Sequence, residues 1–228
     1  MKFYKIWPEI KPSIIGNIEG CQSDSMGPIY NLEKSNSVRR IYQKDFDFNE
    51  FPKIDFNSIY LKKNAKLTDV VWSIKINSLI ALIFNRNLFS VIKKFNLPEY
   101  RISQASIVDS KGDNIEDEYF AFTTLKNQYY IINVEKSIFL IGPDVWPFKL
   151  NKLQISSSEE LERYLINKHW SNRIDGEKII LNKNFKYDLF RLALLGGYYV
   201  TEKLKLAIEN ENLKGIRFEE VSNLLIEN

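Results

Sequence analysis

Residues 118–141 read EYFAFTTLKNQYYIINVEKSIFLI, and this stretch decides the fold class. Its aromatic and β-branched residues favour three β-strands, at 118–124, 128–134 and 137–141. The short turn at Lys126-Asn127 predicts that the first two of these strands form a hairpin. Because closely spaced strands pair antiparallel, we expect a mainly antiparallel sheet.

Helices are predicted on both sides of this β-rich middle. Ser157 with Glu160 forms a capping box and predicts a helix after residue 157. Thr201 is the predicted cap of a second helix, and Gly215 is expected to take φ > 0 as its C′ glycine. Residues 78–95 show helical spacing with an interruption in the middle. They fit one weak helix or, preferentially, a strand ending near Phe84 followed by a helix over 87–95.

The remaining segments complete an α+β pattern. Further strands are predicted at 3–7, 68–76, 153–155, 177–181, 187–192, 198–200 and 216–221. We therefore expect a single α+β domain over residues 1–228, with a mainly antiparallel sheet and two or three packed helices. Residues 1–66 are expected to be a loop-rich N-terminal portion, and 67–228 to hold the sheet and helices.

One segment of the N-terminal portion leaves two interpretations open. Residues 44–60 alternate acidic and aromatic side chains. They fit a recognition strip, or an edge segment that buries Phe46, Phe48, Phe51 and Phe56 in the core.

Composition excludes several classes of chemistry. The chain holds one His and one Cys, so a His/Cys zinc cluster, an internal disulfide and a histidine pair on a metal are impossible. The net charge is +3, but the basic residues stand in separated pairs such as Lys62-Lys63 rather than in a dense stripe. We therefore expect no nucleic-acid partner, no metal and no cofactor.

The sequence also predicts the compartment. The N-terminus lacks the apolar region of a signal peptide, and the apolar stretch near 79–84 is far shorter than a bilayer requires. With Cys21 unpaired, we expect a cytoplasmic protein without membrane contact.

Candidate catalytic groups are few. His169 falls at a predicted helix end, where it complements the helix dipole, and no motif supplies it with a nucleophile. Cys21 lies in a polar loop with nothing to lower its pKa. No phosphate-binding loop occurs. The densest acidic run, at 113–118, is expected to be a solvated loop, so no catalytic residue is assigned.

The aromatic residues in loops leave two interpretations open: each fills the core from its loop, or it binds a partner. Trp and Tyr supply large contact area at low entropic cost, and Arg, Trp and Tyr dominate interface energies. The predicted partner-binding residues are three aromatics and three acids: Trp146, Phe148, Trp170, Glu116, Asp117 and Glu118.

The C-terminal third resembles a family of bacterial immunity proteins of polymorphic toxin systems. The resemblance lies in Asp188-Leu189-Phe190-Arg191, in the run from Val200-Thr201-Glu202 to Ala207, and in Gly215-Ile216-Arg217-Phe218. Family members typically close with a D-x-F-R-like strand, a V-S-E-x-L-K-x-A helix and a G-x-x-F strand. Phe3-Tyr4-Lys5 and 129–133 add to the resemblance, which covers about half of the chain.

The resemblance implies a non-enzymatic protein that binds a cognate toxin domain and neutralises it by direct occlusion. The positive net charge disfavours a nucleic-acid mimic. Two alternatives remain open. A carboxylate-dependent hydrolase would need a deep pocket with two convergent acids, one with a raised pKa. A regulatory module that binds a small molecule or peptide would need an apolar cavity of about 300 Å³ or more.

Overall fold

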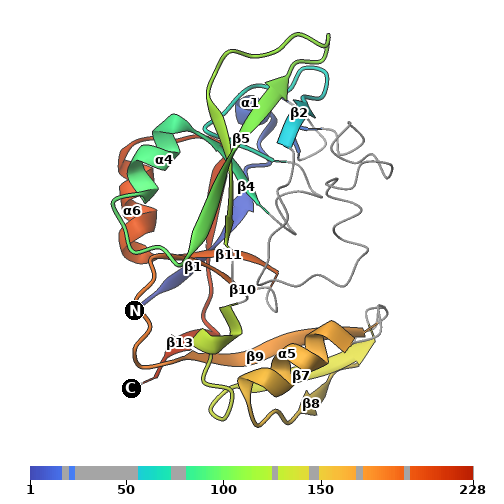
Figure 1. The fold of residues 1–228 in the computed structure, drawn as a ribbon, viewed down its shortest axis with the longest axis vertical. Coiled ribbons are helices and arrows are strands. Elements are labelled where there is room, and N and C mark those ends of the chain that lie inside the picture. Colours follow the sequence, from blue (N-terminus) through green and yellow to red (C-terminus); the bar gives the residue numbers. More distant parts are fainter. Residues whose placement is uncertain are drawn as a thin grey trace.

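The computed structural model describes residues 1–16, 21–23, 56–72, 81–124, 128–143, 149–167, 172–192 and 196–227. In this part of the chain, three mostly antiparallel sheets and three helices of seven or more residues form an α+β fold, which confirms the predicted class (Figure 1). No helix in these ranges is long and apolar enough to cross a bilayer.

The central sheet has the strand order β10-β11-β1-β12 and is antiparallel throughout. Its strands are β10 (Leu189–Leu192), β11 (Gly197–Thr201), β1 (Phe3–Pro8) and β12 (Ile216–Glu220). The N-terminal strand thus lies between two strands from the last third of the chain. The predicted opening strand and the predicted strands near 187–192, 198–200 and 216–221 are confirmed with small shifts of their ends.

The inner part of the central sheet is buried on both faces, and alternate residues of its strands point into different cores. Phe3, Phe190 and Tyr199 pack into one hydrophobic core, where the Phe3 and Phe190 rings meet edge-to-face with centroids 5.5 Å apart. Tyr4 and Val200, their neighbours in sequence, pack into a second core on the other face. This explains why β11 is apolar at nearly every position rather than alternating.

The second sheet has five strands in the order β2-β5-β6-β4-β3. They are β2 (Phe56–Tyr60), β5 (Tyr100–Val108), β6 (Tyr119–Thr124), β4 (Leu82–Asn85) and β3 (Val70–Val71). The β2–β5 pair is parallel and the others are antiparallel. Helices α4 (Arg86–Ile92) and α6 (Glu202–Asn210) lie side by side near this sheet and share its core with the central sheet (Figure 1).

The third sheet has the order β13-β9-β7-β8, and helix α5 (Ser158–Asn167) lies across it (Figure 1). Its strands are β13 (Leu224–Ile226), β9 (Asn172–Leu181), β7 (Ile138–Pro143) and β8 (Asn151–Leu153). Ser157 is the N-cap as predicted, because its Oγ accepts from the backbone N–H of Glu160 at 3.1 Å. The return bond of the capping box is displaced by one residue, since the Glu160 carboxylate accepts from the backbone N–H of Ser156 at 2.7 Å. Strand β13 was not predicted, and β9 begins five residues earlier than expected because β7 pairs along its length.

The predicted hairpin after residue 118 is wrong. Strand β6 lies inside its sheet with β4 on one side and β5 on the other, so no edge is left for a hairpin partner. Residues Gln128–Ile131 form a short 3₁₀ helix, η2, instead of a strand. The buried side chains at 129, 131, 132 and 134 do not follow the period of two that a strand requires.

Within 78–95, the described residues 81–95 form the preferred alternative, a strand followed by a helix. Strand β4 ends at Asn85, whose side-chain oxygen accepts from the backbone N–H of Leu88 at 3.2 Å and thereby caps α4. In 44–60, Phe56 is buried in the core, as the edge-segment interpretation predicts. Phe46, Phe48 and Phe51 lie outside the described residues.

Candidate functional site

A polar hollow of about 420 Å³ opens where five segments of the chain meet. They are helix α1 (Pro12–Ile15), the loop before β3, the end of β4, the start of β6 and the loop between α6 and β12. The lining residues carry charges of both signs: Ser13, Ile14, Lys66, Leu67, Thr68, Asp69, Asn85, Asp117, Tyr119 and Lys214.

The floor of this hollow is a loop held by buried hydrogen bonds. The Gln22 side chain donates to the Lys66 carbonyl at 2.6 Å and to Thr68 Oγ1 at 2.9 Å. Thr68 Oγ1 in turn donates to the Val70 carbonyl at 2.6 Å, and the Tyr119 hydroxyl donates to the Thr68 carbonyl at 2.6 Å. Because Gln22 and Thr68 are buried, these bonds fix the loop in one conformation.

Asp69 connects three elements at the edge of the hollow. Its Oδ1 accepts from Asn85 Nδ2 at 2.9 Å and from Asn87 Nδ2 at 3.4 Å, while its Oδ2 accepts from the Lys214 backbone N–H at 2.6 Å. A single carboxylate therefore joins the β3 loop, the N-terminal cap of α4 and the loop that leads into β12.

Gly215 lies under the same loop. Its φ is +93°, as predicted, but helix α6 ends at Asn210, so it is not the C′ residue of that helix. A Cβ at this position would lie 2.4 Å from both Thr68 Oγ1 and the Val70 carbonyl oxygen. Glycine is thus required here by the close approach of the β3 loop as well as by its φ.

Lys66, Asp117 and Lys214 are exposed at the edge of the hollow, whereas Asp69 is half-buried. Lys66 Nζ donates to the Ser13 carbonyl at 3.0 Å. Among the described residues, neither Asp69 nor Asp117 forms an ion pair. Burial raises the pKa of Tyr119, and the negative charges of Asp117 and Asp69 raise it further, so the Tyr119 hydroxyl stays protonated and acts as a donor.

The structure brings one predicted partner-binding residue, Asp117, to the hollow. Glu116 and Glu118 are exposed beside it, and Glu118 forms an ion pair with Arg86 at the start of α4. Trp146, Phe148 and Trp170 lie outside the described residues, as does His169. Cys21 is buried rather than placed in an open polar loop.

Thr68, Asp69 and Lys214 of the hollow, and Gln22 in the hydrogen bonds beneath it, could not be identified from the sequence. Asp69 and Lys214 alone are 145 positions apart, and none of the four belongs to a motif with its own spacing. One residue of the hollow does carry a sequence signal: Asn85 stands at the interruption in 78–95, where a helix cap is expected.

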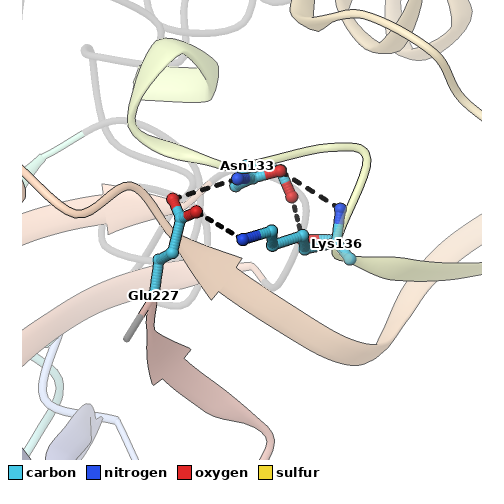
Figure 2. Close-up of polar contacts among 4 residues, drawn as sticks. Asn133, Lys136 and Glu227 are labelled. Carbon is cyan, nitrogen blue, oxygen red and sulfur yellow. Dashed lines mark hydrogen bonds and ion pairs between the residues drawn. The ribbon is translucent and has the colours of Figure 1, made fainter.

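A second polar cluster fixes the end of the chain. Figure 2 shows Glu227, which follows β13, facing Asn133 and Lys136 in the turn before β7. Lys136 Nζ donates to Glu227 Oε1 at 2.6 Å and Asn133 Nδ2 donates to Oε2 at 3.0 Å. These contacts lower the pKa of Glu227, chiefly through the Lys136 hydrogen bond and then through Asn133. They attach the three-residue strand β13 at its free end.

Groups for metal or cofactor binding are not assembled in the described ranges. No three His, Cys, Asp or Glu side chains there come close enough to hold an ion. The enclosed apolar space between α4, α6 and the central sheet measures about 10 Å³, roughly the room of one water molecule.

Comparison with known proteins adds no assignment. No protein-family model matches the sequence, and no curated protein matches it.

Proposed function

We propose that this chain is a cytoplasmic immunity protein that binds a cognate toxin domain and neutralises it by direct occlusion, without a catalytic step. The segments that carry the family resemblance support it, because they assemble in one place. Strands β1, β10, β11 and β12, together with helix α6, contain nearly all of them. The resemblance thus corresponds to a contiguous part of the fold.

The observation that carries the proposal is the polar hollow. Two carboxylates without an ion-pair partner among the described residues, Asp69 and Asp117, line a surface depression whose floor is fixed by buried hydrogen bonds. A preorganised surface loses little entropy on binding. Its charges of both signs, Asp69 and Asp117 beside Lys66 and Lys214, would orient a partner that presents the complementary charges.

A pair of tyrosines, one exposed and one half-buried, supplies a second contact of the kind that an interface uses. Tyr130 in η2 is 47% exposed, and its hydroxyl lies 3.4 Å from that of Tyr187. Tyrosines held in this way combine contact area with hydrogen bonding, which suits them to anchor an interface. Trp146, Phe148 and Trp170 remain predicted anchors.

A carboxylate-dependent hydrolase is the second candidate, because the hollow brings Asp69 and Asp117 together. The geometry favours it less. Both oxygens of Asp69 already accept N–H donors, whereas a general acid must present a proton to its substrate. The described carboxyls with a shifted pKa, Asp109, Glu159, Glu160 and Glu227, are all shifted downward.

The proposal predicts a toxin gene immediately upstream, and the test is co-expression with the toxic domain that this gene encodes. We expect growth to be rescued and the two chains to purify as a complex. If neither rescue nor a complex is observed, the proposal is wrong. Titration of the purified toxin with this protein separates the two candidates. Occlusion requires one equivalent of this protein per toxin, whereas an enzyme would abolish toxin activity at far lower molar ratios.

A matched set of variants then locates the surface. Glu116→Lys combined with Asp117→Lys should weaken the complex, while Glu135→Lys, an exposed acid in the turn before β7, should leave it unchanged. Alanine at Trp146 and Phe148 tests the aromatic prediction separately. Equal affinity for all variants would place the toxin elsewhere on the surface.

A further inference from the structure

Strand β12 is an outer strand of the central sheet. In the order β10-β11-β1-β12 it pairs with β1 on one side, and no described strand pairs with its other side. Unpaired edges of this kind are ready templates for another strand. The question is which strand would fit.

The hydrogen bonds to β1 determine which groups of β12 point outward. Val221 N–H donates to the Phe3 carbonyl at 2.9 Å, and Glu9 N–H donates to the Gly215 carbonyl at 3.2 Å. In an antiparallel pair, alternate residues bond to the neighbouring strand. The backbone N–H and C=O groups of the odd-numbered residues of β12 therefore point to β1. Those of Ile216, Phe218 and Glu220 point away from it.

A contact just before the strand agrees with this alternation of odd- and even-numbered residues. The carbonyl of Lys214, an even-numbered residue, accepts from Val70 N–H at 3.2 Å, which is a bond away from β1. The same contact sets the limit of the free edge. Residues 216–220 are the part available to an incoming strand.

The sequence of this edge is complementary to itself. We propose that β12 pairs with β12 of a second copy, antiparallel and centred on Phe218. In that register Arg217 lies opposite Glu219 of the second copy, and Glu219 lies opposite its Arg217. Phe218 lies opposite Phe218, and the outward backbone groups of 216, 218 and 220 meet as bonded pairs.

The charges on the sheet face fit this arrangement. Arg217 and Glu219 are both exposed and, two residues apart, point to the same face. Lys5 lies opposite Glu219 across the β1–β12 pair. Pairing of two copies would thus produce a row of alternating sign, Lys5, Glu219 and then Arg217 of the second copy. An unrelated strand would need its own charges in this order.

Charge-reversal variants test the proposal by analytical ultracentrifugation over a concentration series. The unmodified protein should dimerise, whereas Arg217→Glu and Glu219→Arg should each weaken the dimer by about tenfold or more, because each places like charges opposite one another. The double variant should dimerise again. An equimolar mixture of the two single variants should form a heterodimer, because the new acid of one variant then faces the new base of the other.

The proposal requires both the dimer and its response to the charge reversals. Circular dichroism and thermal unfolding confirm that the variants keep the fold, which is expected since both side chains are exposed. A protein that stays monomeric at all concentrations would overturn the proposal. So would a dimer that is insensitive to either reversal, or a double variant that fails to recover.

Discussion

The carboxylate of Asp69 accepts the backbone N–H of Lys214 at 2.6 Å, across 145 positions of sequence. Asp69→Ala would leave that donor, and the Asn85 side-chain amide, without their acceptor. We expect the free energy of unfolding to fall by about 1–3 kcal/mol, measured by urea denaturation.

Asn87→Ala is the matched control for this substitution. It removes only the exposed 3.4 Å bond to Asp69 and should cost about 0.5 kcal/mol or less. If Asp69→Ala proved as mild as Asn87→Ala, the connecting role of Asp69 would be refuted.

Gly215→Ala should be severely destabilising. The new Cβ would lie 2.4 Å from Thr68 Oγ1 and from the Val70 carbonyl oxygen, in a backbone with φ of +93°. We expect a loss of about 2–4 kcal/mol from overpacking together with the unfavourable φ, measured as the shift of the urea midpoint at constant slope.

Gly112→Ala separates the cost of the steric contact from the cost of the positive φ. Gly112 has a similar φ of +98°, and a Cβ there would meet no atom within 4 Å. It should cost about 1 kcal/mol from conformation alone. Similar losses at both glycines would mean that the contact with the β3 loop adds nothing.

Much of the fold could be predicted from local pattern, and the failures have a physical cause. Thr201, Ser157 and Asn85 cap their helices through contacts with residues three positions away, which a sequence displays directly. The hairpin after residue 118 failed because strand propensity does not reveal which edges of β6 are already occupied. Gly215 was correctly expected to have φ > 0, but the residues that require it come from another segment.

The candidate site was harder to predict for the same reason. Asp117 was found because it belongs to a dense acidic run, whereas Asp69 and Lys214 stand in ordinary surroundings. They become a site only through long-range contacts among loops.

Thr201 offers a test of the segment that carries the family resemblance. Its hydroxyl donates to Asp188 Oδ1 at 2.7 Å and accepts from the Leu204 N–H at 3.4 Å, in a buried position. Thr201→Val keeps the shape but loses both bonds, so the free energy of unfolding should fall by about 1–3 kcal/mol.

Thr201→Ser keeps the hydroxyl and should cost about 1 kcal/mol or less, for the lost methyl group. Thermal unfolding of the two variants measures the difference. The capping role would be contradicted if serine were as destabilising as valine.

The last prediction concerns pH and the contact between Glu227 and Lys136. The native pKa of Glu227 lies below its ordinary value of 4.5, chiefly because Lys136 donates to the carboxylate. A lowered native pKa means that the unfolded chain takes up the proton first, so this stabilisation is complete above the ordinary value. It is then lost as the pH falls through the native value.

The difference in unfolding free energy between the unmodified protein and Glu227→Gln should therefore be constant near neutral pH and shrink below about pH 4.5. Urea denaturation at a series of pH values measures it. Lys136→Met, which removes the charged donor, should lessen this pH dependence, because the largest cause of the lowered pKa is then gone. A difference that stayed constant down to about pH 3 would show that the carboxylate form of Glu227 does not help to hold β13 in place.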